Sequence, residues 1–312
     1  MMTTELSNVL NIRYIKLHFT IQFAEDTIMP KNKVSALRGG MGEMLLRANC
    51  IRERKCESCD FETECIVQRT MYSKFEKKPD FITSGDSIGY VLECENYQEE
   101  FCAGETLQFN LILFGKTIVY FSQYMNAFYA LGTQGVGKNY SKFYIISVTN
   151  NRKEELLINN NIYMKNYKVQ TVKEYVEYRI KQLENKEILN ILVFKTPLAL
   201  KYQNELLFEF NAEAIMRAVK RRIYMLDCFE NIEGEEYYTK NFEIPNIIKQ
   251  ESSKIKVKRY SSRQDSKMVL SGIEGYAEFE SIDRETLCLL LAGELIHIGR
   301  NTSFGFGRYR VN

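Results

Sequence analysis

Residues 293–311 bring together two residue types that suit the binding of anions. Glycine lets the backbone adopt a positive φ and approach a ligand closely, and the planar guanidinium of arginine holds two phosphate oxygens at once. The glycines are Gly299, Gly305 and Gly307, and the arginines are Arg300, Arg308 and Arg310. Exposed amides in such a loop form a concavity for an anion. The segment therefore predicts a phosphate site, with a phosphodiester backbone as the expected ligand.

A histidine beside this loop is the candidate for proton transfer, because imidazole titrates near neutral pH. The chain has 2 histidines. His297 precedes Gly299 and Arg300, so we expect it to act as the acid or base, with a structural role or an RNA contact as the alternatives. His18 alternates with apolar residues in a predicted strand over residues 13–23, and we interpret it as a sheet-face residue without a ligand role.

Four of the 8 cysteines follow the pattern C-x5-C-x2-C-x5-C: Cys50, Cys56, Cys59 and Cys65. Four thiolates suit tetrahedral zinc in a closed, structural site, and an iron–sulfur cluster takes the same ligands. Free thiols on a loop are the remaining alternative. We expect structural zinc, which would staple an insertion at about residues 50–65. The remaining cysteines fall in or near apolar segments and are interpreted as packing residues.

Basic residues are clustered, although the net charge is only +2. One cluster covers residues 217–222 and includes Arg222; the other covers residues 254–267. In the second cluster, Arg259, Tyr260, Ser262, Arg263 and Gln264 combine the groups that contact phosphate, base and sugar in RNA complexes. For Lys254, Lys256 and Lys258, a solvated strand face is as good an interpretation as an RNA-binding surface.

Composition is that of an ordinary globular chain, with 45% hydrophobic and 26% charged residues. The first residues lack the basic and apolar stretches of a secretory signal, and no apolar run is long enough to cross a membrane. We therefore expect a protein of the reducing cytoplasm, where a tight cysteine cluster indicates metal binding rather than disulfides.

The order of the predicted elements repeats once along the chain. Each half reads as a β-α-β-β-α-β unit, which predicts an α+β fold of tandem ferredoxin-like (RRM-like) domains. We expect an N-terminal domain over residues 1–149, a linker region over 150–188 and a C-terminal domain over 189–312. The halves end alike, in Gly135-Val136-Gly137-Lys138 and in Gly305-Phe306-Gly307-Arg308.

These motifs, in this order, resemble the RAMP superfamily, the repeat-associated RNA-binding proteins of CRISPR systems. Within it, the chain most resembles the endoribonucleases that process CRISPR repeat RNA. The matching stretches are Leu37-Arg38-Gly39-Gly40-Met41-Gly42, Phe114-Gly115, Ala130-Leu131-Gly132, Thr196-Pro197-Leu198, Arg259–Gln264, Gly272-Ile273-Glu274-Gly275 and the C-terminal glycine-rich loop. The resemblance also implies the tandem ferredoxin-like fold.

What the resemblance implies chemically is RNA cleavage without a catalytic metal. The ribose 2′-hydroxyl attacks the adjacent phosphate, giving a 2′,3′-cyclic phosphate and a 5′-hydroxyl. Many relatives place a catalytic histidine near the first helix, but residues 25–49 contain none. Lys33 and Arg38 remain as candidates for stabilising charge on the phosphate.

The predicted partner is CRISPR repeat RNA, with CRISPR effector subunits as further candidates. The predicted RNA contacts are Lys138, Arg222, Arg259, Tyr260, Ser262, Arg263, Gln264, Gly299, Arg300, Asn301, Ser303, Gly305, Gly307 and Arg308. The alternative is a non-catalytic RAMP subunit that holds guide RNA in an effector complex. An enzyme acting on a small phosphorylated molecule is disfavoured, because the chain has neither a P-loop nor a dinucleotide fingerprint.

Overall fold

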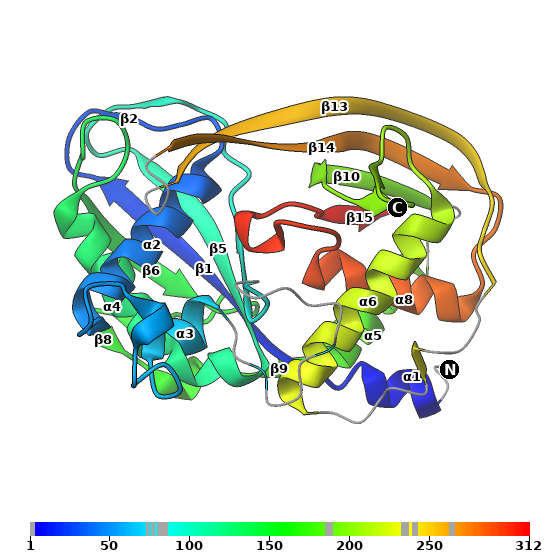
Figure 1. Ribbon diagram of the computed structural model, residues 1–312, viewed down its shortest axis with the longest axis horizontal. Helices are drawn as coiled ribbons and strands as arrows, with labels where there is room; N and C mark the ends of the chain where they lie inside the picture. The colour runs from blue at the N-terminus through cyan, green and yellow to red at the C-terminus, as the bar shows by residue number, and fades with distance from the viewer. Residues whose placement is uncertain are drawn as a thin grey trace.

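A computed structural model describes residues 4–72, 75, 79, 87–184, 190–231, 237–238, 243–261 and 266–312. It consists of two antiparallel sheets with helices packed on them, drawn at the left and right of Figure 1. Among the described residues, no helix combines the length and apolar character needed to cross a membrane.

The first half is a complete β-α-β-β-α-β unit. Its elements are β1 (Arg13–Phe23), α2 (Lys33–Asn49), β3 (Tyr90–Glu93), β5 (Thr106–Phe114), α4 (Phe121–Gln134) and β6 (Phe143–Thr149). The sheet order is β3-β5-β1-β6, with β9 (Gln170–Thr171) added to β1. Alternate residues of β1, from Ile15 to Phe23, join α2 and α4 in one buried cluster. This period-2 burial is what the sequence pattern predicts for a sheet covered on one face.

The second half repeats the same topology. Its elements are β10 (Ile191–Leu198), α6 (Ala212–Glu230), β13 (Ile247–Ser261), β14 (Ser266–Phe279), α8 (Arg284–Ile296) and β15 (Tyr309–Val311). The order β13-β14-β10-β15 matches β3-β5-β1-β6 strand for strand. The tandem ferredoxin-like prediction is therefore confirmed. The strands β13 and β14 form a long hairpin that arches over the top of the molecule (Figure 1).

Local signals set the starts of the helices in the second half. Asp283 caps α8 by accepting hydrogen bonds from the amides of Glu285 and Thr286, at 2.8 and 3.0 Å. Asn211 caps α6 through the amide of Ala214 at 2.9 Å. Side-chain oxygens at these positions satisfy amides that have no partner within the helix.

The segment expected to be a linker is folded against both halves. Its β9 pairs with β1, and α5 (Val172–Leu183) begins with a capping box formed by Thr171 and Glu174. The apolar face of α5 is buried with α8. The boundaries at 149/150 and 188/189 stay predictions.

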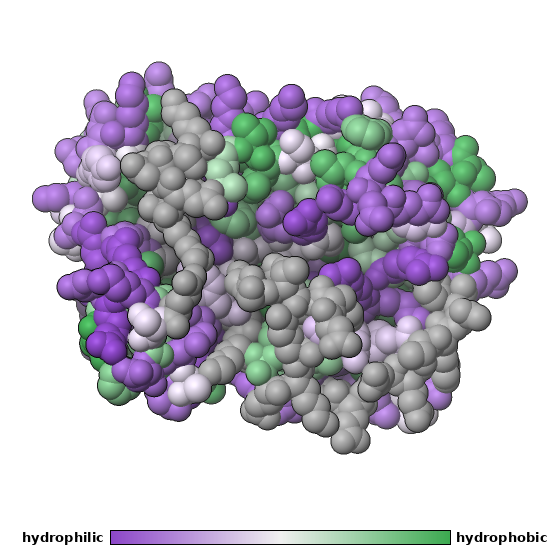
Figure 2. All heavy atoms as spheres, in the orientation of Figure 1, coloured by the Kyte–Doolittle hydropathy of each residue, from purple (hydrophilic) through white to green (hydrophobic). Residues whose placement is uncertain are grey.

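The two halves share part of one core. The helix α1 (Thr4–Val9) packs with α6 of the second half. Tyr14, Val91 and Phe114 of the first sheet are buried in the same cluster as α6 and α8. The halves are thus held together by apolar burial, the dominant stabilising contribution in folding. On the face drawn in Figure 2, the exposed apolar surface lies in separate patches among hydrophilic residues.

The remaining short elements lie in the connections. They are β2 (Thr27–Ile28), η1 (Cys56–Ser58), α3 (Ile66–Met71), β4 (Glu100–Phe101), η2 (Gly115–Tyr120), β7 (Leu157–Ile158), β8 (Asn161–Ile162), η3 (Met164–Asn166), β11 (Lys201–Tyr202), β12 (Glu205–Leu206) and η4 (Thr302–Phe304).

Candidate nucleic-acid interface and active site

A cavity of about 430 Å³ lies at the junction of the two halves. Helix α2 and the segment before β3 contribute from the first half; α6, the start of β11 and the loop after α8 contribute from the second. Among the described residues that line it, none is acidic and five are basic: Arg38, Lys201, Arg221, Arg222 and Arg300. Hydroxyls of Ser87, Thr302 and Ser303 also line it. A concave surface with one sign of charge focuses the electric field on an anionic ligand. We call it the arginine cavity.

Arg38 lies at the centre of this cavity's contacts. Its Nε donates to Ser303 Oγ at 3.3 Å, and its Nη2 donates to Ser87 Oγ at 3.0 Å. Its guanidinium carbon lies 4.0 Å from the centre of the Phe304 ring. The side chain is half-buried and has hydroxyl rather than carboxylate partners, so its positive charge stays available to an anion.

Arg259 of β13 packs against Phe304 as well. Its guanidinium carbon lies 4.5 Å from the ring centre, and one donor contacts Met268 Sδ at 3.2 Å. Its buried Nε has no acceptor among the described residues. Burial, with a contribution from Arg38, lowers the pKa of Arg259. Arg38 and Arg259 thus share one aromatic ring, and neither has a carboxylate partner among the described residues, which favours an anionic ligand beside them.

The glycine-rich loop is packed inside the molecule rather than open to solvent. Gly305 has φ +78, and an added Cβ would lie 2.8 Å from the Leu92 carbonyl of β3. Gly307 has φ +71, and a Cβ added there would lie still closer to the Ile298 carbonyl. Their amides donate to Thr302 and Pro197 carbonyls. These two glycines therefore allow close packing, and the expectation that their amides form an open anion cradle has no support in this geometry.

The exposed part of the loop is its beginning. Gly299, Arg300, Asn301 and Ser303 all line the arginine cavity. Arg300 is exposed, and Asn301 has a left-handed backbone with φ 63. The side chain of Arg300 makes no hydrogen bond or ion pair with any residue that the structure describes. Four of the predicted RNA contacts are thus brought together with Arg38.

His297 lies in the interior and does not line the cavity. It is fully buried; Nδ1 lies 3.0 Å from the Phe306 carbonyl and Nε2 lies 3.0 Å from Glu93 Oε1. Its backbone has φ 58 and ψ 154, a conformation that surrounding contacts must hold in place. Burial lowers its pKa, opposed by Glu93. With both ring nitrogens engaged, this geometry favours a structural role over proton transfer.

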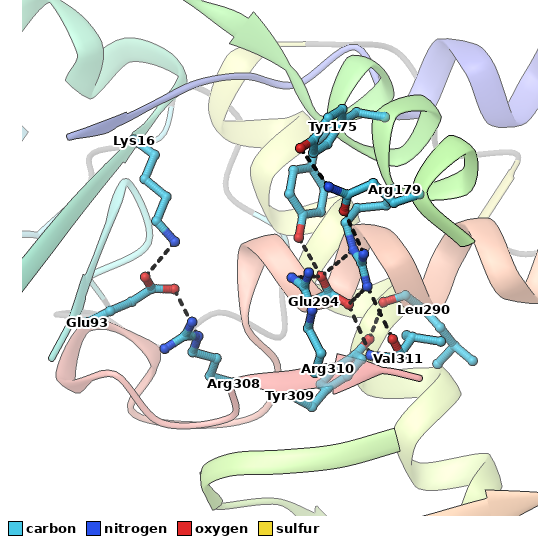
Figure 3. A network of polar contacts seen from close by, with 12 residues as sticks. Lys16, Glu93, Tyr175, Arg179, Leu290, Glu294, Arg308, Tyr309, Arg310 and Val311 are labelled. Atoms are coloured by element: carbon cyan, nitrogen blue, oxygen red, sulfur yellow. Dashed lines mark hydrogen bonds and ion pairs between the residues drawn. The ribbon is translucent and has the colours of Figure 1, made fainter. Parts of the chain in front are cut away.

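Glu93 carries a polar network across the two halves. Its Oε2 accepts from Lys16 Nζ at 2.6 Å, and Arg308 Nε lies 3.4 Å from Oε1 (Figure 3). Oε2 also accepts from Asn110 Nδ2 at 2.8 Å. Asn110 Oδ1 in turn lies 2.7 Å from His18 Nδ1. Despite complete burial, these partners hold the pKa of Glu93 well below its usual range. His18 is half-buried and thus belongs to a polar network of the sheet that extends to the buried Glu93.

Two arginines of the tail are paired with carboxylates. Arg308 contacts Glu95 and Glu93, which raises its pKa against the effect of burial. Arg310 donates to Glu294 Oε1 at 2.6 Å (Figure 3). Because these guanidiniums are neutralised by the protein, they are weaker candidates for phosphate contacts than Arg38 or Arg300.

Arg222 is buried and joins the halves. It donates to the Ile296 carbonyl at 3.2 Å and to the Ile88 carbonyl at 3.1 Å. Its neighbour Arg221 is exposed and lines the cavity with Lys201. Sequence reasoning chose Arg222 and missed Arg221 and Lys201 as cavity residues. The signal was present in α6, where Arg222 falls on the apolar stripe with Val219 and Leu226 and Arg221 lies beside it.

Other predicted residues lie away from the cavity. Lys33 is buried and donates to the carbonyls of Pro30 and Lys31, both at 3.4 Å; burial lowers its pKa. Lys138 is exposed in the turn beside β2, where its amide donates to Ile28. Ser262, Arg263 and Gln264, together with the side chain of Tyr260, fall outside the described residues.

The cysteine loop lies at the far end of α2 from the loop after α8. Cys50, Cys56, Cys59 and Cys65 line one cavity of about 270 Å³. As placed, no three histidine, cysteine or carboxylate side chains among the described residues are grouped to hold a metal.

Two ferredoxin-like units with a basic cavity at their junction place the protein in a class that is suited to nucleic-acid binding. A family model described as the AF_1859 N-terminal domain matches residues 11–174. A second, described as CRISPR-associated endoribonuclease Cas6, matches residues 192–309. The chain belongs to the family of the AF_1859 N-terminal domain, whose model covers more than half of it, and its residues 192–309 are similar to the Cas6 family.

Solved structures agree on the fold. A chain of a partial Cas6-RT-Cas1–Cas2 complex is 10% identical, with a TM-score of 0.60; the match covers 97% of this chain and 47% of that one. A chain of the Cas6-RT-Cas1–Cas2 complex has the same identity and TM-score, with 29% of it covered. This chain therefore spans half or less of these larger proteins. A Cas6 product complex is 13% identical, with a TM-score of 0.52, and is covered completely. Among curated proteins, none matches in sequence.

Proposed function

We propose that this chain binds CRISPR repeat RNA and cleaves it at the arginine cavity by attack of a ribose 2′-hydroxyl. The observation that carries the proposal is the lining of that cavity, in which the part of the chain that the structure describes places five basic residues and no acidic one. The match of residues 192–309 to a family described as a CRISPR-associated endoribonuclease and the cavity's position between two ferredoxin-like units also support it.

The reaction balances with the RNA, the protein and water alone. The 2′-oxygen bonds to phosphorus and releases its proton, while the bond from phosphorus to the 5′-oxygen breaks and that oxygen takes up a proton. The products are a 2′,3′-cyclic phosphate and a 5′-hydroxyl. Extra negative charge on the phosphate oxygens is the main electrostatic barrier, and fixed cations lower it.

The residues divide between positioning and charge stabilisation. Arg38, held by two hydroxyls and the Phe304 ring, presents a preorganised guanidinium to the phosphate. Arg300 supplies a second cation from the opposite side of the junction. Lys201 lines the same cavity, and we assign its ammonium the donation of a proton to the leaving 5′-oxygen. The proton of the attacking 2′-hydroxyl is transferred to water.

The test is cleavage of host repeat RNA in EDTA, run beside RNA with a 2′-deoxy sugar at the cut site. Cleavage that survives EDTA and stops on 2′-deoxy substitution supports the proposal. Loss of cleavage in EDTA, or cutting of the 2′-deoxy RNA, contradicts the mechanism.

A non-catalytic RAMP subunit is the second candidate. It is favoured by one observation: both histidines lie outside the lining of the arginine cavity. Tight binding of repeat RNA without cleavage, under conditions where the folded protein is verified, would establish this reading.

A further inference from the structure

Four cysteines are placed at the ends and the middle of one loop, between α2 and α3 (lower left of Figure 1). Cys50 is the C-cap of α2, and its amide donates to the Leu46 carbonyl at 2.8 Å. Cys65 is the N-cap of α3, and its carbonyl accepts from Arg69 at 3.1 Å. A metal ion bound by Cys50 and Cys65 would therefore connect the end of α2 to the start of α3.

The other two cysteines flank a single tight turn. Cys56 begins the 3₁₀ turn η1, and the Cys59 amide donates back to the Cys56 carbonyl at 3.2 Å. A C-x2-C pair on such a turn brings two thiols to one side of the chain, as zinc knuckles require. Both thiols line the same cavity as Cys50 and Cys65.

The surroundings suit thiolates. All four cysteines are unpaired by disulfides, and each is exposed or half-buried, so packing alone does not account for them. The Arg54 amide donates to Cys50 Sγ at 3.3 Å. Hydrogen bonds of this kind stabilise and orient the ligands of a metal. Arg52, Lys55, Glu62 and Glu64 also line the cavity, so the charged side chains beside the cysteines balance one another.

We propose that Cys50, Cys56, Cys59 and Cys65 bind one structural zinc ion as a tetrahedral four-thiolate site. The four thiols line one cavity, but as placed no three of them among the described residues are grouped to hold a metal. Rotation about each Cα–Cβ bond and closure of the loop on the ion would complete the site. Four protein ligands leave no open position, so this zinc supports folding and takes no part in RNA cleavage.

Metal analysis of the full chain, purified in reducing buffer without added chelator, tests the site. We expect about one zinc per chain. The double variant Cys56→Ser/Cys59→Ser should lose it, while Cys102→Ser, which changes an exposed cysteine outside the loop, should keep it. The double variant should also melt at a lower temperature and be cleaved more readily by protease within residues 50–65.

Replacement of zinc by cobalt in the wild-type chain tests the site even where the double variant fails to fold. Co²⁺ titrated into the wild-type chain after zinc removal should give thiolate-to-metal charge-transfer bands and the intense visible bands of tetrahedral cobalt. A wild-type chain that contains no metal and binds no cobalt would overturn the proposal. Iron with labile sulfide would overturn zinc as the occupant, and metal retained by the double variant would overturn these ligands. None of these results depends on RNA cleavage.

Discussion

His297 Nε2 lies 3.0 Å from Glu93 Oε1, and this contact joins the residue that ends α8 to the last residue of β3. Both side chains are buried, so the contact lies in the interior of the junction between the halves. It places the loop after α8, and with it Arg300, relative to the first half.

His297→Ala should therefore act mainly on stability. The change removes a buried hydrogen bond and leaves a cavity, at a cost of about 2–4 kcal/mol. Chemical denaturation measures this cost, and cleavage assayed below the melting temperature should keep the wild-type pH profile. A variant with wild-type stability and no cleavage would instead place His297 in the chemistry.

Arg38→Ala should lower the cleavage rate about 10²-fold, because it removes a preorganised cation from the phosphate. Arg38→Lys should recover part of the loss by restoring the charge without the two-hydroxyl contact. Single-turnover rates at saturating protein separate this effect from binding. Lys138→Ala is the matched control, since it removes an exposed cation away from the cavity. Equal losses in the two alanine variants would mean that general charge, not the cavity, drives the rate.

The strand and helix order could be predicted from the sequence because it depends on local periodicity. Alternation in β1 and the repeated order of elements were enough to predict two ferredoxin-like units. The internal placement of the glycine-rich loop could not be predicted in this way. It depends on contacts of Gly305 with Leu92 and of His297 with Glu93, residues about 200 positions apart in the chain.

The candidate site was predictable in part for the same reason. Arg38 and Arg300 were chosen from their own motifs, and the fold brings them to one cavity. Arg308 carries the same residue type in the same tail, yet Glu93 and Glu95 neutralise it. Only the three-dimensional pairing of charges distinguishes these arginines.

Glu294→Gln should be strongly destabilising. Glu294 accepts from Arg179 Nε at 2.8 Å and from the Val311 amide at 3.0 Å, and Arg179 is buried beside it (Figure 3). Removing the carboxylate leaves a buried cation without its counter-charge, which costs about 3–5 kcal/mol. Glu213→Gln weakens a pair with the exposed Arg217 one helical turn away but keeps an oxygen that can accept from Tyr202, so it should change stability by less than about 1 kcal/mol. Urea denaturation of both variants compares the pairs.

Asp227 gives the stability a pH dependence of its own. Burial raises its pKa to about 8, opposed by a hydrogen bond from the Tyr238 hydroxyl. A raised carboxyl pKa favours the folded state fully below the unfolded value near 4, and the benefit is lost as pH rises toward 8. The melting temperature of Asp227→Asn, relative to wild type, should therefore increase from pH 4 to pH 8 and then level off. A difference that does not change with pH would mean that Asp227 is ionised throughout.

Arg300→Ala should change how RNA binding depends on salt. Each phosphate contact releases counterions, so the slope of log K against log salt concentration should become shallower by about 0.7 for single-stranded RNA. Arg300 is exposed on the cavity and has no carboxylate partner among the described residues, which makes it the cation best placed to contribute such a contact. Arg310→Ala is the matched comparison, because Glu294 already neutralises that guanidinium, and its slope should stay at the wild-type value. Binding measured by fluorescence anisotropy over a range of salt concentrations gives both slopes. An unchanged slope for Arg300→Ala would mean that the arginine cavity does not contact the RNA phosphates through Arg300. This conclusion would hold whatever the effect of the variant on affinity at one salt concentration.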